Sequence, residues 1–286
     1  MNREQLMSET LLSISLSAEY AKKSVLRNIT FHIERGEILG LVGQSGCGKS
    51  TLALAILRLL HLKGGRAVGI IQLNGLDLMS LSERQMRSIR GKEIGLVLQS
   101  PLSSLNPVLR IGTQLVEAWD AHRSGSRQEC RNALLESLAN VSLPAEEEFL
   151  RRYPAQLSVG QAQRVLIAMG VLHRPTLLIA DEPTSALDVI TQAEVLGLFR
   201  NLSKQMGVAI LYITHDLLSV STIADRIAVM HKGEIVECRE PQAIFTDPQH
   251  AYTRNLIAAL PSVPGLLPTR ERTYHIPVKS HAAGRS

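Results

Sequence analysis

The sequence is poor in aromatic residues and in cysteine. Phenylalanine, tryptophan and tyrosine make up 3% of its 286 residues, which argues against a nucleic-acid surface built on base stacking. Its three cysteines, Cys47, Cys130 and Cys238, form no CxxC pair. We therefore predict neither a disulfide framework nor a zinc or iron–sulfur site, and the cysteine usage indicates a reducing compartment.

Long apolar segments are missing as well. No apolar run approaches the length of a membrane span, and the opening residues lack the basic region and apolar core of a signal peptide. If the protein serves a membrane, the spans are therefore expected in other chains. Apolar residues still make up 45% of the sequence, enough for a sizeable core, and the length favours one domain with an appendage.

Charge is unevenly distributed along the chain. The formal net charge is +5, from 31 basic against 26 acidic residues, and residues 268–286 contain four basic residues against one acidic residue. We interpret 261–286 as a short, flexible basic tail after a domain that covers about 8–260. A contact of this tail with phospholipid or nucleic acid is the alternative interpretation.

Hydrophobic periodicity predicts an α/β fold. Residues 11–17 and 29–33 alternate between apolar and polar, as an antiparallel pair of half-buried strands does. Short apolar runs, typical of strands buried on both faces, occur at 37–42, 94–98, 176–180, 208–213 and 227–230. Helical patterns separate most of these runs, so we expect a mostly parallel sheet covered on both faces, with the antiparallel pair as a β edge.

One long segment is helical throughout. Between about 100 and 174 the strand patterns give way to helical ones, at 112–121, 127–141 and 160–172. We interpret this segment as an α-helical subdomain inserted into the α/β core, whose two parts are then about 8–99 and 175–248. A last helix is predicted over 251–259.

A glycine-rich loop follows the first buried run. Residues 43–50, GQSGCGKS, match the pattern GxxxxGK[ST] and lie between a predicted strand and a predicted helix. The glycines let backbone N–H groups curve around phosphates at a helix N-terminus, where the helix dipole favours anions. Lys49 is expected to contact the β- and γ-phosphates, and the Ser50 hydroxyl to ligate Mg²⁺. The sequence therefore predicts a P-loop that binds MgATP.

Two carboxylates end another buried run. Residues 177–182, LLIADE, form a predicted strand that would present Asp181 to the Mg²⁺ shell and Glu182 to a water in line with the γ-phosphate. Glu182 is then the candidate general base. The alternative is that these carboxylates only cap the helix that follows.

A second anion cradle is predicted at residues 157–161, LSVGQ, which precede a long helical pattern. Ser158 and the backbone of Gly160 would lie at the N-terminus of that helix. Taken alone, the segment is explained more simply by Ser158 acting as an ordinary N-cap.

With residues 185–188 (SALD) and 213–216 (ITHD), these motifs occur in an order that resembles the ATPase subunits of ABC transporters. The resemblance covers 43–216 and implies a P-loop NTPase core with an inserted α-helical subdomain, the ABC ATPase fold. It also implies that the LSVGQ segment of one subunit closes over ATP held by a second, similar subunit. Val159 stands where the signature of that family has glycine, so its side chain must be accommodated at the interface.

The resemblance implies further roles, position by position. Tyr20 is similar to an aromatic residue that stacks on adenine, although an ordinary strand-end tyrosine is the alternative. Gln99 resembles the glutamine that touches Mg²⁺ and the attacking water. Asp188 resembles an aspartate of the dimer interface, and His215 a histidine that holds the γ-phosphate.

The resemblance thus implies three sets of site residues. The implied catalytic residues are Lys49, Gln99, Glu182 and His215, and the implied Mg²⁺ ligands are Ser50, Gln99 and Asp181. The implied ATP contacts are Tyr20, Gly43, Ser45, Gly46, Gly48, Lys49, Ser50, Thr51, Gln99, Ser158, Gly160, Gln161, Asp188 and His215.

Four longer strings, at 99–107, 152–158, 186–193 and 250–253, are similar to ATP-binding subunits of importers for oligopeptides, dipeptides and nickel. This resemblance implies a second, related ATPase chain, two transmembrane permease subunits and an extracytoplasmic substrate-binding protein. It places the chain at the cytoplasmic face of the inner membrane. No cysteine follows Cys238, so we expect no iron–sulfur cluster of the kind that many peptide-type members carry.

An importer subunit has two alternatives. Soluble ABC ATPases act in DNA repair and translation, but the long coiled coils, zinc modules or second ATPase half that mark them are not found in this sequence. A non-catalytic regulatory module is opposed by the intact Lys49, Asp181, Glu182 and His215. We therefore expect no nucleic-acid partner.

Overall fold

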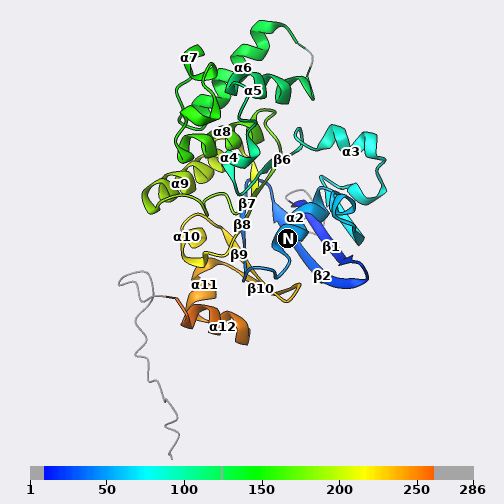
Figure 1. The fold of residues 1–286 in the computed structure, drawn as a ribbon. Helices are drawn as coiled ribbons and strands as arrows, with labels where there is room; N and C mark the ends of the chain where they lie inside the picture. The colour runs from blue at the N-terminus through cyan, green and yellow to red at the C-terminus, as the bar shows by residue number, and fades with distance from the viewer. Residues whose placement is uncertain (1–9, 124, 261–286) are drawn as a thin grey trace, which may run out of the picture.

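The computed structural model describes residues 10–123 and 125–260, so the predicted tail over 261–286 lies outside the described residues. Figure 1 shows two β-sheets, with α5 to α8 gathered at one side of the molecule and α11 and α12 at the opposite side. Within the described ranges, no helix has both the length and the apolar character needed to cross a membrane.

A six-stranded sheet forms the centre of the core. Its strand order is β10-β9-β3-β8-β7-β6, and the neighbouring pairs are parallel except β9 with β10. The sequence located five of these strands to within one residue at each end, and the predicted mostly parallel sheet is confirmed. The strands are β3 (Ile38–Val42), β6 (Ile94–Val97), β7 (Leu177–Asp181), β8 (Ala209–Thr214), β9 (Arg226–His231) and β10 (Glu234–Arg239).

A separate four-stranded antiparallel sheet has the order β2-β1-β4-β5. The predicted pairing of β1 with β2 is confirmed, but β4, which pairs along the other side of β1, was not predicted. Only Ile71 and Leu73 of β4 are buried, so the strand leaves almost no hydrophobic pattern. The strands are β1 (Thr10–Tyr20), β2 (Lys23–Glu34), β4 (Gly65–Leu73) and β5 (Leu76–Asp77).

Strand β3 joins the two halves of the hydrophobic core. Leu39 and Leu41 pack in the cluster that contains the antiparallel sheet, whereas Ile38 and Val42 pack in the cluster that contains the helical insert. Alternate side chains of a strand point to opposite faces, and burying each of these four contributes about 1.5–3 kcal/mol. The strand that leads into the glycine-rich loop is therefore fixed from both sides.

The helical insert packs closely on the parallel sheet. Its last helix approaches β6 through two glycines: a Cβ atom added to Gly95 would lie 2.2 Å from the carbonyl oxygen of Gly170. The predicted helices at 112–121, 127–141 and 160–172 are present with small shifts at their ends. The helices of the insert are α4 (Pro101–Ser104), α5 (Ile111–Asp120), α6 (Arg127–Asn140), α7 (Glu147–Leu150) and α8 (Val159–Val171).

The remaining helices belong to the core and to its C-terminal end. They are α2 (Lys49–Ile56), α3 (Glu83–Ile89), α9 (Val189–Met206), α10 (Leu217–Ser221), α11 (Pro241–Thr246) and α12 (Ala251–Ala258). Short 3₁₀ turns occur at Leu60–Lys63, Leu78–Ser80 and Pro154–Gln156. Helix α12 is the predicted last helix.

Candidate active site

The catalytic candidates follow the carboxyl ends of three neighbouring strands. Strand β3 leads into the P-loop, β7 ends at Asp181, and β8 leads to His215. Because β8 lies between β3 and β7 and all three are parallel, their carboxyl ends meet at one edge of the sheet, where α/β proteins bind ligands. Segments more than 100 residues apart are brought together in this way.

The P-loop takes a backbone path that requires glycine. A Cβ atom on Gly43 would lie 2.3 Å from the carbonyl oxygen of Met230 in β9, so the loop can approach β9 only without a side chain. Gly46 and Gly48 have positive φ angles of 81° and 116°, which L-residues with side chains rarely adopt. The loop conformation is therefore encoded by the motif itself.

The Lys49 side chain reaches back across the mouth of this loop. Its amine is buried, with 6% of the side chain exposed, and donates hydrogen bonds to the carbonyl oxygens of Gly43 at 2.7 Å and Gln44 at 3.3 Å. The Nζ atom is 3.8 Å from Oε1 of Glu182. A positive charge is thus held where the backbone of the loop curves.

Glu182 lies between two potential partners of a phosphate. Its Oε2 atom is 2.8 Å from Nδ1 of His215, and its other oxygen faces Lys49. The residue has a φ angle of 50°, and its backbone N–H donates to the carbonyl oxygen of Ile213 at 2.9 Å. Glu182 is 13% exposed and His215 is 59% exposed, so the carboxylate is screened from bulk water while the imidazole remains accessible.

Asp181 fits a metal ligand better than a helix cap. Its Oδ1 atom is buried without a hydrogen-bond partner among the described residues, and burial raises the pKa of this carboxyl, opposed by a hydrogen bond from Ser50. An unpaired buried carboxylate oxygen is costly, and a carboxylate with a hydroxyl is an oxygen donor pair that suits Mg²⁺. Mg²⁺ needs few protein ligands when a substrate phosphate supplies others.

The positions of Gln99 and Tyr20 do not test the roles implied for them. Gln99 is exposed in the loop between β6 and α4, and within the described chain no hydrogen bond joins it to Ser50 or Asp181. Tyr20 ends β1, and its ring lies over Gly65, where an added Cβ atom would come within 2.5 Å of the ring. The roles implied for both residues remain predictions.

Ser158 and Asp188 act as N-caps here. The Ser158 hydroxyl accepts from the backbone N–H of Gln161 at 3.1 Å, and the Gln161 side chain accepts from the Ser158 N–H at 3.1 Å, which completes a capping box. Asp188 accepts hydrogen bonds from the N–H groups of α9, and these bonds lower the pKa of its carboxyl.

The N-termini of α8 and α9 are adjacent. A Cβ atom on Gly160 would lie 2.7 Å from the Thr191 side chain.

Tyr252 is a site residue that the sequence analysis did not identify. Its hydroxyl accepts a hydrogen bond of 3.3 Å from the backbone N–H of Gln44 in the P-loop, and its ring stacks on His231 with the centroids 3.9 Å apart. The string at 250–253 indicated an importer, but no local pattern could show that α12 lies against a loop 208 residues away.

We expect Tyr252→Phe to weaken MgATP binding about fivefold, because the variant keeps the stacked ring and loses one hydrogen bond, worth about 1 kcal/mol, that fixes the loop. Tyr153→Phe, in the insert, is the matched control and should bind as the wild type does. Equilibrium titration with MgATP measures the affinity of each protein. Equal affinities of Tyr252→Phe and the wild type would show that the contact does not support the loop.

Comparison with known proteins assigns the family. Residues 26–185 match the family described as ABC transporter. This chain belongs to that family. It is 44% identical over 258 residues to the glutathione import ATP-binding protein GsiA of Escherichia coli O6:H1, covering 88% of this chain and 41% of GsiA. It is 42% identical over 253 residues to the oligopeptide transport ATP-binding protein OppD of Bacillus subtilis, covering 88% and 71%. The chain thus spans less than half the length of GsiA.

Solved structures agree with the family assignment. CbiO1 of Clostridium perfringens, described as part of the ABC transporter complex CbiONQ, matches with a TM-score of 0.74 and 26% identity over 84% of this chain and 92% of its own. The ATP-binding cassette MJ0796, solved as a post-hydrolysis dimer with ADP and phosphate, matches with a TM-score of 0.68 and 28% identity over 81% and 98%. The predicted fold and the predicted membership of the ABC family are both confirmed.

Proposed function

We propose that this chain is the ATP-hydrolysing subunit of an importer for a small peptide, nickel or a metal chelate. The Glu182 carboxylate, which follows β7 and is held between Lys49 and His215, carries the hydrolytic part of the proposal. The relatives named for glutathione import and oligopeptide transport support import and a peptide-like cargo. These names give no support to the alternative, an ABC ATPase of DNA repair or translation.

The proposed reaction breaks the terminal phosphoanhydride bond of ATP. The P-loop N–H groups and the amine of Lys49 bind the triphosphate. Glu182 takes a proton from a water as the water oxygen bonds to the γ-phosphorus, and ADP leaves with the electron pair of the broken bond. His215 keeps the carboxylate in position through its 2.8 Å contact, and its exposed ring is free to reach the phosphate.

The residues that would hold Mg²⁺ are Ser50 and Asp181, with Gln99 as a third oxygen ligand. When bound, Mg²⁺ neutralises charge on the phosphate oxygens. The unpartnered Oδ1 of Asp181 supports this placement.

A second ATPase subunit is the proposed partner at the N-termini of α8 and α9. Ser158, Gly160 and Gln161 lie at one of these termini and Asp188 at the other. Val189 is 81% exposed and Ile190 75% exposed, so two adjacent apolar side chains face solvent here. A partner that covers this face would bury both side chains and bring its own ATP against the two helix N-termini, which favour anions.

We expect Ser158→Arg to leave MgATP binding to the variant chain unchanged and to lower steady-state hydrolysis about tenfold or more, because a bulky cation at the cap obstructs closure over the partner's ATP. Hydrolysis by the wild type should rise more steeply than linearly with protein concentration. Ser142→Arg, at an exposed turn of the insert, is the control. Specific activity that is independent of concentration would contradict the shared site.

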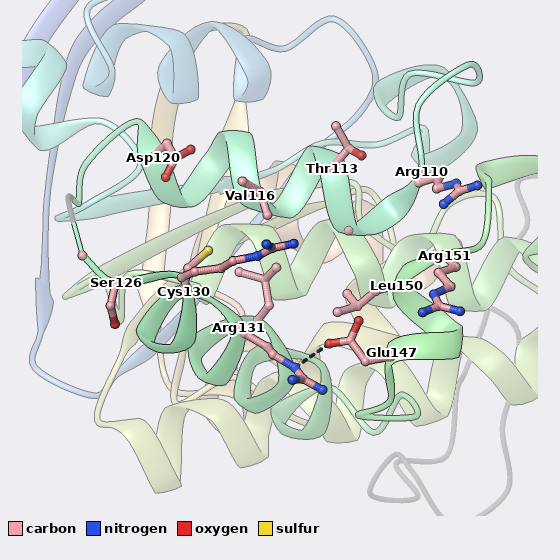
Figure 2. Close-up of a pocket in the computed structure, with 14 residues that line it drawn as sticks. Arg110, Thr113, Val116, Asp120, Ser126, Cys130, Arg131, Glu147, Leu150 and Arg151 are labelled. Atoms are coloured by element: carbon pink, nitrogen blue, oxygen red, sulfur yellow. Dashed lines mark ion pairs between the residues drawn. The ribbon is translucent and has the colours of Figure 1, made fainter.

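The permease subunits are proposed to dock on the helical insert. A groove with a volume of about 920 Å³ lies between α5, α6 and α7, and Figure 2 shows Arg110, Arg131 and Arg151 around it, with Arg131 ion-paired to Glu147 at 2.6 Å. Docking there would link the membrane subunits to the segment that follows Gln99. The chain itself would then be peripheral, at the cytoplasmic face of the inner membrane.

Reconstitution tests the importer assignment. The chain, a related ATPase subunit and two permease subunits in vesicles should show cargo-stimulated ATP hydrolysis in the presence of the extracytoplasmic binding protein. A several-fold stimulation of the isolated chain by DNA or RNA would instead favour the soluble alternative. The purified chain is also expected to show no iron–sulfur absorbance.

A further inference from the structure

A basic pocket lies outside the nucleotide site, where the core meets the helical insert. Helix α3 of the core forms one wall, and the end of α5 with the turn after it forms the other, around a volume of about 500 Å³. Its charged and polar lining consists of Arg84, Arg87, Ser88, Lys92, Asp120 and the pair His122–Arg123. We call these residues the basic pocket.

Its cations outnumber its carboxylates four to one and make no ion pair within the described part of the chain. Arg84, Arg87, Lys92 and Arg123 line the pocket with one carboxylate, that of Asp120, and none of the four makes an ion pair within 4.0 Å there. The neighbouring Arg90, by contrast, is paired with Glu83. Unpaired cations around a hollow repel one another and attract an anion that can contact several of them.

One wall of the pocket is held rigidly. The guanidinium of Arg123 stacks over the ring of Trp119 at 5.2 Å, and Trp119 stacks in turn on the buried His173 at 5.8 Å. The His122 ring meets His173 edge-on at 5.1 Å, and a Cβ atom on Gly91 would come within 2.8 Å of it. The Arg123 side chain is therefore positioned before any ligand arrives.

The other wall has its hydrogen-bond donors on one face of α3. Helix α3 begins with a capping box between Ser82 and Gln85, which fixes its first turn. Arg84, Arg87 and Ser88 are spaced three and four residues apart, so they lie on one face of this helix. Two guanidinium groups and a hydroxyl can thus contact one ligand together, as in sites for phosphate.

We propose that the basic pocket binds a phosphate-bearing anion, contacted by Arg84 and Arg87 from the core and by Arg123 from the insert. A phospholipid headgroup and a soluble phosphate ester share this chemistry. The identification of the ligand as a lipid headgroup rests on the membrane location proposed above. The phosphate site itself does not depend on that location. Because its contacts come from both walls, the ligand would also tie the insert to the core.

The single tryptophan of the sequence reports directly on this pocket, since Arg123 covers the Trp119 ring. The full chain is titrated with glycerol 3-phosphate, and separately with phosphatidylcholine vesicles with and without one third phosphatidylglycerol, at constant ionic strength. We expect a saturable change in tryptophan emission with a phosphate probe. Response to glycerol 3-phosphate indicates a soluble ligand, and response confined to phosphatidylglycerol vesicles indicates a headgroup.

Two variants with equal changes in charge make the test specific. The double variant Arg84→Gln and Arg87→Gln should weaken the response on the order of tenfold or more. Its control, Arg27→Gln with Arg200→Gln, removes two exposed arginines of β2 and α9 and should respond as the wild type does. Both should keep the wild-type melting temperature and MgATP affinity. No saturable response to either probe, or equal losses in the two variants, would overturn the proposal, and neither result bears on ATP hydrolysis.

Discussion

Replacing Glu182 with glutamine is expected to lower ATP turnover about 10²- to 10⁴-fold, the range typical of a lost general base, while the affinity for MgATP changes by less than about threefold. The side-chain amide of glutamine can keep the contact with His215, and the backbone N–H still donates to the carbonyl oxygen of Ile213. It cannot accept a proton from water. The variant therefore separates catalysis from binding, and phosphate release with equilibrium MgATP titration measures the two effects.

Glu194→Gln is the matched control for this change. Glu194 is an exposed residue of α9 that is paired with Arg164 at 2.7 Å, away from the P-loop, and its variant should hydrolyse ATP at the wild-type rate. If Glu182→Gln retained steady-state turnover comparable to the wild type, Glu182 would not be the base.

Lys49→Ala is expected to weaken MgATP binding about 100-fold or more. The variant loses a buried amine that can make two charge-assisted hydrogen bonds, each worth about 1.5–3 kcal/mol. It also removes the cation that faces Glu182 at 3.8 Å and that lowers the pKa of Asp181 against the effect of burial. Phosphates would then meet two carboxylates without a compensating charge.

Equilibrium binding of ATP, with and without Mg²⁺, measures this loss. Lys204→Ala, at an exposed position of α9, controls for the change in net charge and should bind ATP as the wild type does. Circular dichroism must show that Lys49→Ala is folded. A folded variant with unchanged affinity would contradict the placement of Lys49 on the phosphates.

The parallel sheet was predictable because its strands are buried on both faces. Five short apolar runs marked β3, β6, β7, β8 and β9 to within one residue, since two-sided burial leaves continuous hydrophobic segments. Strand β4 could not be found in this way. Only two of its residues are buried, and it contains Gly69, where an added Cβ atom would lie 2.2 Å from the carbonyl oxygen of Ser15.

The grouping of the candidate catalytic residues was predictable for a different reason. Lys49, Asp181, Glu182 and His215 lie at or just after the carboxyl ends of buried strands, and parallel strands place such residues at one edge of the sheet. Their catalytic roles remain predictions. Contacts formed between distant segments leave no such trace, which is why Tyr252 was missed. The cap bonds of Ser158 agree with the simpler local interpretation of its segment. Asp188 is also an N-cap, and the action of both residues on a partner's ATP remains a prediction.

We infer that the insert turns about the point where Gly95 and Gly170 approach each other. Neither residue has a side chain, so the backbones of β6 and α8 lie close together there. Gly170 lies near the last residue of α8, whereas Ser158 caps its first. Twelve residues of helix make a lever arm of about 18 Å, so a rotation of about 10° would sweep Ser158 through about 3 Å, the length of one hydrogen bond. A tilt of this size would make or break one hydrogen bond between Ser158 and the partner's phosphate that is proposed to lie there.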